Sequence, residues 1–141
     1  FNIKTMTTTT PVSLQSTEVS VPGELVTFPT TKLVFNSPFD MQKVYFIKIE
    51  NTSPHKIGYF FNSTTSTITF KPEKGCLFQG DSKTIDVTCD AFNDLLAHND
   101  DRILVVWTRA PDSARRGVFH RTWFKNDGIM HIKNLRIEYN E

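Results

Sequence analysis

The sequence predicts an all-β fold, an immunoglobulin-like sandwich of about seven strands in two sheets. Three observations support this fold class. Short β-rich runs recur after Pro29, turn residues separate them about every ten positions, and helical periodicity is rare. The chain has 141 residues, the size of one domain that can bury a core without disulfides or metal.

The strands are expected in seven runs, the first of which begins at Lys32. In chain order the runs are "KLVF", "KVYFIKIEN", "KIGYFFNST", "STITF", "KTIDVTCD", "RILVVWT" and "NLRIEYN". The segments between them, including "NSPFD", "TSPH" and "KPEKG", have the composition of turns.

Alternation along these runs identifies the inward faces. In "KVYFIKIEN", Tyr45, Ile47 and Ile49 share one face, as in a half-buried strand. "RILVVWT" is apolar nearly throughout, which is typical of a central strand covered on both faces. The same reasoning predicts a core that includes Ile85, Val87, Ile103, Val105 and Trp107.

One or two short helical turns are also expected. "AFNDLLAHND" places Phe92, Leu95 and Leu96 at i, i+3 and i+4, with Asp90 as the N-cap. "VFHRTWF" places Phe119 four residues before Trp123, although this segment also fits strand alternation.

The chain is expected to divide into an arm and one domain. Residues 1–20 are threonine-rich and lack a helical period, which predicts a flexible arm, and residues 21–141 form the domain. Met6 is a candidate natural start, so residues 1–5 are left out of fold reasoning. No apolar run approaches the ~20 residues that span a bilayer, and no secretory signal is present. We therefore expect a soluble, cytoplasmic protein without an integral membrane segment.

The stretch "RRGVFHRTWFKNDG", residues 115–128, mixes cations with aromatic rings, as in proteins that bind single-stranded nucleic acid. The net charge of the chain is only +1, which argues against nucleic acid as a partner. The structural interpretation is that the rings face inward: Phe119, Trp123 and Phe124. The cations then coat the exposed side: Arg115, Arg116, Arg121 and Lys125.

No pattern of catalytic, metal-binding or cofactor-binding residues stands out, so the sequence predicts a protein that is not an enzyme. The four histidines (55, 98, 120 and 131) are scattered outside known nucleophile motifs and are expected at turn and surface positions. The acidic segment "DAFNDLLAHNDD" lacks the glycine and final glutamate of an EF-hand loop. Cys76 and Cys89 match no zinc spacing and are interpreted as small buried residues. No glycine-rich phosphate loop occurs.

Four residues are expected to have structural roles. Pro29 and Pro72 flank strands, and because proline cannot donate to a ladder they must lie at an edge, a bulge or a turn. Trp107 is interpreted as a core residue, and Trp123 as the residue that holds its segment against the sandwich.

Several blocks resemble one known family. "TKLVFNSPFD", "FIKIENTS", "VTCDAF", "NDDRILVVWTRAPD", "RTWFKNDG" and "KNLRIEYN" follow one another as they do in the major sperm protein of nematodes. The resemblance runs from about Val21 to the C-terminus. It implies the same sandwich, with cis peptide bonds before Pro29 and Pro72.

The resemblance also implies a function. Members of the family form symmetric dimers that assemble into filaments, without nucleotide, in the cytoskeleton of the sperm pseudopod, and these filaments drive amoeboid motility. They also reach oocytes as an extracellular signal, released without a signal peptide. Implied partners are the protein itself and accessory proteins of the sperm cytoskeleton. The longer arm, the single proline in "KPEKG" and the arginine pair 115–116 depart from filament-forming members, so a paralogue that stops at the dimer stays open.

A peptide-binding module is the alternative function. Domains of this kind in vesicle-associated-membrane-protein-associated proteins capture acidic, phenylalanine-containing peptides through a threonine pair and an arginine pair. Here Val44-Tyr45 and Ser66-Thr67 stand at those places, so the charge-assisted contacts are lost.

Self-association is expected near the first two strand runs, residues 31–35 and 44–49. "TKLVF" is short, β-prone and holds one charge, so an edge formed by it is poorly protected against pairing with another chain. Identical subunits close most readily about a two-fold axis. The candidate contact residues are Thr31, Lys32, Leu33, Val34, Phe35, Val44 and Lys48.

Overall fold

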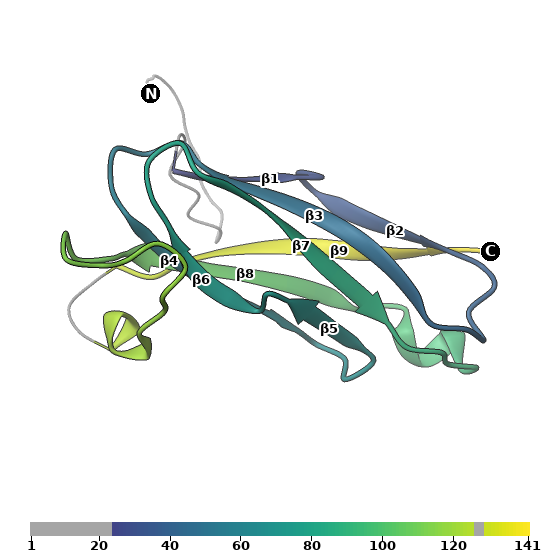
Figure 1. Ribbon diagram of the computed structural model, residues 1–141. Coiled ribbons are helices and arrows are strands. Elements are labelled where there is room, and N and C mark those ends of the chain that lie inside the picture. The colour runs from purple at the N-terminus through teal and green to yellow at the C-terminus, as the bar shows by residue number, and fades with distance from the viewer. Residues whose placement is uncertain (1–23, 126–128) are drawn as a thin grey trace, which may run out of the picture.

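The protein is a sandwich of two β-sheets (Figure 1). The computed structural model describes residues 24–125 and 129–141. Sheet A has the strand order β1-β3-β7-β5, and sheet B has the order β2-β9-β8-β4-β6. The prediction of an all-β, immunoglobulin-like fold is confirmed, with nine strands in the described residues instead of seven. The expected arm, residues 1–20, lies outside the described residues.

The strands are short except for β3, β7, β8 and β9. Sheet A consists of β1 (Leu25–Phe28), β3 (Lys43–Asn51), β7 (Ser82–Cys89) and β5 (Ile68–Lys71). Sheet B consists of β2 (Lys32–Asn36), β9 (His131–Asn140), β8 (Arg102–Arg109), β4 (Ile57–Ser63) and β6 (Lys74–Leu77). β2 and β9 are parallel, and the other neighbours are antiparallel.

Sequence analysis missed two strands, β1 and β6, and each adjoins a proline. The chain leaves sheet A at Pro29 and continues as β2 in sheet B, and it crosses again at Pro72 between β5 and β6. Both prolines lie between strands, where no ladder donor is required. The peptide bonds before them are cis, as the resemblance implied, and so is the bond before Pro38. The segment "KPEKG" is therefore a crossing into a strand and not a simple turn.

The predicted core is confirmed. Ile85, Val87, Ile103, Val105 and Trp107 are all buried, on alternating positions of β7 and β8 that face each other between the sheets. Complete burial of one such aliphatic side chain stabilises the fold by about 1.5–3 kcal/mol. Cys76 and Cys89 are also buried and unpaired, as expected.

The two predicted helical turns exist as single 3₁₀ turns, η1 (Leu95–His98) and η2 (Arg121–Phe124). Two details of η1 were wrong, because it is preceded by Asp94 instead of Asp90 and because Leu96 is 84% exposed. A 3₁₀ turn repeats every three residues, so His98, and not Leu96, lies on the same side as Leu95 and is buried.

The rings of the 115–128 stretch cover the outer face of sheet B, as predicted, although they are only half-buried. Phe124 packs edge-on against Phe60 of β4 with ring centroids 5.2 Å apart. Trp123 lies over Gly58, where an added Cβ would come within 2.4 Å of the indole Cε3. Gly58 therefore creates the space that Trp123 occupies.

One of the four cations in this stretch does more than coat the surface. Arg116 pairs with Asp81 (Nε to Oδ2, 2.7 Å) and lies 4.5 Å from the ring centroid of Phe78. The hydrogen bond from Arg116 lowers the pKa of the Asp81 carboxyl. This pair joins the segment after β8 to the turn between β6 and β7. Residues 126–128 lie outside the described residues.

We predict that Gly58→Ala destabilises the domain by about 1–3 kcal/mol, because the new methyl group displaces Trp123. Urea unfolding followed by circular dichroism measures the change. In a Trp123→Ala background the same substitution should cost almost nothing, since the clashing ring is absent. Equal costs in both backgrounds would show that Trp123 does not occupy this position.

Candidate self-association surface

One edge of sheet A is only half covered. β1 pairs with β3 from residue 48 to residue 51. Residues 43–47 of β3 pair with β7 on one side and have no strand of sheet A on the other. Figure 1 shows β1 and β2 following each other along this side, with β3 next to them. Because β2 has joined sheet B by then, the first half of β3 stays open.

The hydrogen bond at the end of the β1–β3 ladder shows which backbone N–H and C=O groups of β3 face the open edge. The N–H of Thr52 donates to the carbonyl of Glu24, which precedes β1, at 2.7 Å. Residues of a strand alternate in direction, so the even-numbered residues of β3 point to the β1 side. Val44 and Phe46 lie beyond β1 and therefore direct their N–H and C=O groups to an edge that no strand of the described residues covers.

β2 is the edge strand of sheet B and extends the same open side. The N–H of Ser37 donates to the carbonyl of Asn140, the last residue of β9, at 3.0 Å, so the backbone groups of odd-numbered residues of β2 face β9. The backbone groups of Lys32 and Val34 consequently point away from the sheet. Each of the two sheets thus contributes unpaired donors and acceptors on one side of the molecule.

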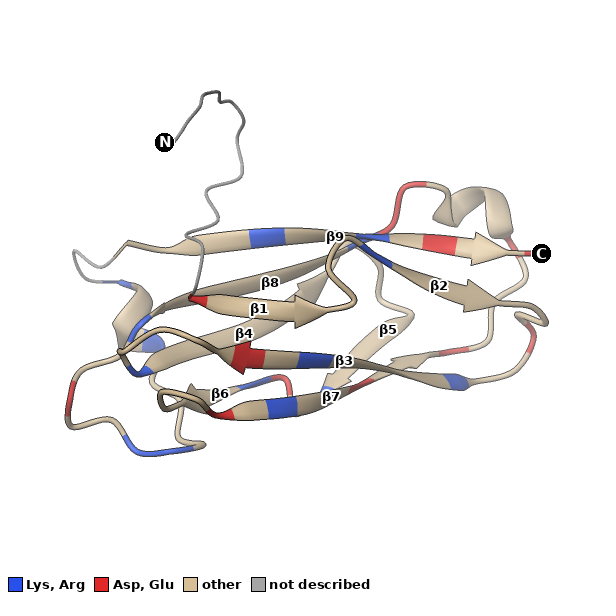
Figure 2. Cartoon of the chain, turned by 90° about the horizontal axis from the view of Figure 1, so that it is seen from above, with Lys and Arg blue, Asp and Glu red and all other residues tan. Residues whose placement is uncertain are grey.

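Exposed apolar side chains lie beside this edge, on the outer face of sheet A. Phe46 is 58% exposed, and Val44 and Phe28 are each 48% exposed. Figure 2 shows no charged residue on β3 between Lys43 and Lys48. An open edge with four uncharged residues in a row, next to exposed aromatic rings, is typical of a protein–protein contact and hazardous in a monomer.

Side chains hold β2 and β3 together although the strands belong to different sheets. The rings of Phe35 and Tyr45 stack with centroids 4.3 Å apart and an interplanar angle of 8°. The Tyr45 hydroxyl accepts a hydrogen bond from the N–H of Asn36 at 2.9 Å, and Lys43 Nζ donates to the carbonyl of Asn36. The two strands therefore present one continuous, ordered surface.

The predicted contact residues divide into two groups. Most have exposed or half-buried side chains at this surface: Thr31, Lys32, Val34, Val44 and Lys48. Leu33 and Phe35 instead pack in the core and support the edge from inside. Self-association through these residues stays a prediction. The structure adds exposed residues that sequence reasoning did not name: Phe28, Met41 and Phe46.

The charge on this surface is partly compensated. Lys32 Nζ lies 2.7 Å from Glu138 Oε1 of β9, and the lysine lowers the pKa of that carboxyl through its hydrogen bond and its charge. Lys48 Nζ lies 6.0 Å from the ring centroid of Phe28. The exposed Lys32–Glu138 ion pair contributes little to stability. This ion pair does reduce the electrostatic repulsion between the Lys32 side chains that two copies would bring together at β2.

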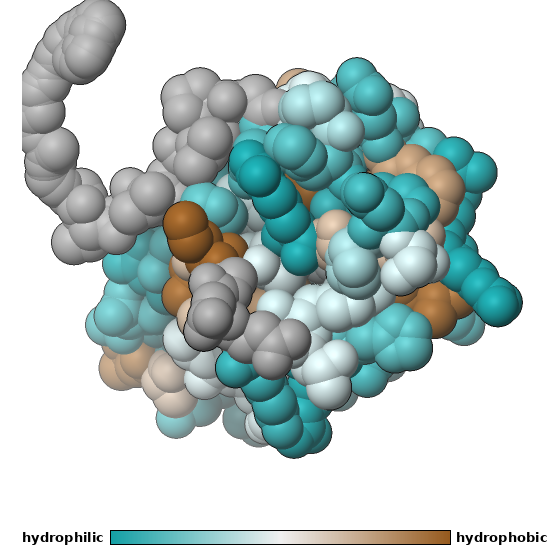
Figure 3. All heavy atoms as spheres, turned by 90° about the vertical axis from the view of Figure 1, so that its left-hand side faces the viewer, coloured by the Kyte–Doolittle hydropathy of each residue, from teal (hydrophilic) through white to brown (hydrophobic). Residues whose placement is uncertain are grey.

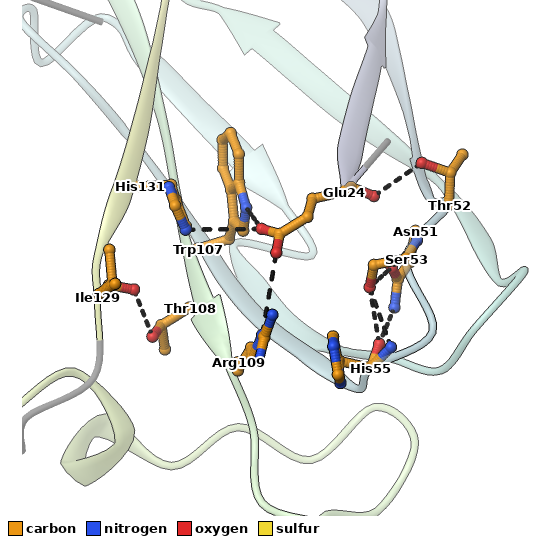
Figure 4. A network of polar contacts seen from close by, with 10 residues as sticks. All are labelled: Glu24, Asn51, Thr52, Ser53, His55, Trp107, Thr108, Arg109, Ile129 and His131. Atoms are coloured by element: carbon orange, nitrogen blue, oxygen red, sulfur yellow. Dashed lines mark hydrogen bonds and ion pairs between the residues drawn. The ribbon is translucent and has the colours of Figure 1, made fainter. Parts of the chain in front are cut away.

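A buried polar cluster fixes the start of β1 (Figure 4). Glu24 Oε1 accepts a hydrogen bond from Trp107 Nε1 at 3.1 Å and lies 3.6 Å from His131 Nε2. Arg109 Nε lies 4.0 Å from the other carboxylate oxygen. These partners compensate the buried carboxylate. They hold the start of β1 against the end of β3, opposite Asn51.

A second buried cluster lies at the other end of the sandwich. His98 Nδ1 and the Tyr139 hydroxyl each approach Asp101 Oδ2, at 2.7 Å and 2.6 Å. Burial and the Asp101 carboxylate raise the pKa of Tyr139. The expectation that all histidines lie at turns and on the surface was wrong for His98 and His131, which are both buried. His131 lies against the carboxylate of Glu24, which is distant in the chain, and His98 lies against that of Asp101, three residues further on.

The described residues offer no further obvious chemistry. Within residues 24–125 and 129–141, no group of three or more histidine, cysteine, aspartate or glutamate side chains could hold a metal ion. No helix of this part of the chain has the length and hydropathy needed to cross a membrane.

The relatives of this chain agree with its architecture. A model of the major sperm protein domain matches residues 24–128. Major sperm protein 152 of Caenorhabditis elegans is 42% identical over 124 residues, which cover 84% of this chain and 94% of that protein. This chain belongs to the major sperm protein domain family. Within the family, major sperm protein 2 of Globodera rostochiensis is 37% identical over 121 residues, which cover 84% of this chain and 95% of that protein.

Solved structures of low sequence identity share the fold of this major sperm protein domain. SSP-19, an MSP-domain protein of Caenorhabditis elegans, matches with a TM-score of 0.59 and 16% identity, covering 80% of this chain and 98% of that one. A PapD-like domain of human CEP192 matches with a TM-score of 0.54 and 10% identity, covering 94% and 96%. These likenesses concern the fold alone.

Proposed function

We propose that this major sperm protein domain is a structural, non-enzymatic protein of the sperm cytoskeleton that self-associates through β2 and the first half of β3. One observation supports the proposal above all: residues 43–47 of β3 form an open sheet edge beside exposed Phe46 and Val44. Two copies related by a two-fold axis would pair these edges and cover the apolar side chains of both. Relatives named major sperm proteins support the assignment to sperm.

Growth beyond a dimer requires a second contact. At the end of the molecule that faces the viewer in Figure 3, apolar residues lie among hydrophilic ones. Ile129, just before β9, is 72% exposed, and Met130 and Ile132 are exposed beside it. These three residues form a second surface, which lies far along the sandwich from the open half of β3. We infer that it joins dimers into filaments, and that filament growth in the cytoplasm of the sperm pseudopod drives motility.

We predict that Phe46→Glu converts the dimer to a monomer, because a charged side chain would replace the most exposed aromatic ring of the two-fold contact. The dissociation constant should rise at least about a hundredfold, as for loss of a central aromatic contact. Sedimentation velocity over a range of concentrations measures it.

The matched control for Phe46→Glu is Leu96→Glu, which puts the same charge on an exposed apolar position of η1. Both variants should keep the wild-type melting temperature to within roughly 2 °C, because neither side chain is buried. Wild-type protein that stays monomeric at about millimolar concentration, or Phe46→Glu that dimerises normally, would contradict the proposal.

A substitution in the second surface should separate dimer formation from filament growth. We predict that Ile129→Glu leaves the dimer in sedimentation and removes filaments in electron micrographs of concentrated protein. The reason is that a charge would replace the most exposed apolar side chain of that surface. Filaments that form unchanged with this variant would assign growth to another contact.

A further inference from the structure

Both methionines among the described residues are exposed, whereas both cysteines are buried. Met41 is 54% exposed and Met130 is 49% exposed, while Cys76 and Cys89 are 1% and 6% exposed. Methionine is one of the residue types most often buried, so this arrangement is unusual. An oxidant that arrives from solvent therefore meets the two thioethers before either thiol.

The environment of the two thiols lowers their reactivity further. Burial raises the pKa of both, that of Cys89 to about 11, where the nearby charge of Asp90 acts in the same direction. The thiolate is the form of cysteine that reacts with peroxides, and a raised pKa keeps both groups protonated at physiological pH. Oxidation of this domain is therefore directed to the thioethers, which need no deprotonation.

Met130 belongs to the second surface, together with Ile129 and Ile132. Ile129 is 72% exposed and Ile132 is 41% exposed. His131, between Met130 and Ile132, is buried and stacks on the Trp107 ring with centroids 5.5 Å apart. Alternation at the start of β9 consequently turns Met130 and Ile132 outward on the same face of sheet B.

The segment that carries Met130 is held in place from behind. Thr108 Oγ1 of β8 donates a hydrogen bond to the carbonyl of Ile129 at 2.9 Å. Trp107 and His131 are opposite each other in the ladder between β8 and β9. The thioether therefore lies on an ordered support, and a change in its polarity acts on the contact surface and not on the core.

Oxidation converts the thioether of methionine to a sulfoxide, which is polar and accepts hydrogen bonds. In the reaction with hydrogen peroxide, the sulfur lone pair forms a bond to one peroxide oxygen and the O–O bond breaks. The sulfur is oxidised, and the other oxygen leaves as water with both hydrogen atoms. Inside an apolar contact the sulfoxide oxygen would lack the hydrogen bonds that water gives it, so covering this surface becomes unfavourable.

We propose that Met130 is a site of reversible oxidation by peroxides and that its sulfoxide stops the growth of filaments from dimers, a regulation that rests on the proposed role of the second surface. Reduction by a dithiol-dependent methionine sulfoxide reductase restores the thioether and with it the apolar surface. The dimer stays intact on oxidation of Met130, because the first half of β3 lies toward the other end of the sandwich (Figure 1).

Met41 is the natural comparison, since its exposure is similar. It lies in the loop between β2 and β3, two residues before Lys43, where β3 begins. It therefore adjoins the self-association surface, and its oxidation bears on the dimer and not on the second surface. Dimers and filaments must consequently be measured separately, in proteins that keep only one of the two methionines.

The test uses two full-length proteins that differ only at residue 130. Both carry Met6→Leu and Met41→Leu, which leaves Met130 as the only methionine of the first protein, since the sequence has three. The second protein also carries Met130→Leu, a change that keeps the size and the apolar character of the side chain. Each is treated with hydrogen peroxide and compared with an untreated sample.

In the first protein, mass spectrometry of peptides should show that folded Met130 gains one oxygen atom at a rate within about fivefold of that in urea-unfolded protein. The critical concentration for filaments should then rise at least about tenfold, as for loss of one buried apolar side chain. Sedimentation velocity should still show dimers. Methionine sulfoxide reductase with dithiothreitol should restore the filaments.

The Met130→Leu protein should form filaments equally well before and after peroxide, because no thioether is left to oxidise. A third variant, Met130→Gln, places an amide that is polar like the sulfoxide at the same position. It should form dimers without filaments before any treatment.

Three results would overturn the proposal: resistance of folded Met130 to peroxide, an unchanged critical concentration after its oxidation, and equal loss of filaments in the Met130→Leu protein. Untreated wild-type protein that forms no filaments would overturn the proposed function itself, and this regulation with it, so the two failures are distinguishable. If the leucine background alone prevents assembly, wild type and the single variant Met130→Leu provide the same comparison.

Discussion

Two crossings of the chain between the sheets, at Pro29 and Pro72, determine the form of both edges of sheet A. Each crossing ends a short edge strand early, so β1 covers half of β3 and β5 covers half of β7. The sandwich keeps its core because the crossing segments continue as edge strands of sheet B. The consequence is a molecule with two open stretches of backbone, each ordered by the core behind it.

The two openings differ in chemistry, and this difference supports different partners. The opening at β3 lies beside exposed Phe46 and Val44, and the neighbouring Lys32 is compensated by Glu138. Such a surface tolerates contact with a copy of itself. The opening at β7 adjoins a cavity whose lining includes Lys74, Lys83 and Tyr59. Lys83 stands on β7 itself, so two copies paired through this opening would bring like charges together.

Local patterns in the sequence were sufficient for the long strands and the core. Val87 alternates with polar residues along β7, so its burial follows from a period of two, and Val105 lies in the almost wholly apolar run of β8. β1 and β6 have four residues each, beside prolines, which is too short for a period to be recognised. The contacts of the sites are also non-local: Arg116 meets Asp81 and Trp107 meets Glu24 across long separations in the chain. No spacing rule predicts such pairs. The burial of Leu33 and Phe35, by contrast, follows from the alternation of β2 itself.

Hydrogen–deuterium exchange of individual amides at increasing protein concentration tests most directly whether the two openings have separate roles. The amides of Val44, Phe46 and Val34 should exchange quickly in dilute protein and become protected as dimers form. Those of Ser82 and Thr84 should keep exchanging in the dimer, because they lie on the opposite edge of sheet A. Protection that appears at Ser82 and Thr84 on dimerisation, or that never appears at Val44 and Phe46, would contradict the account.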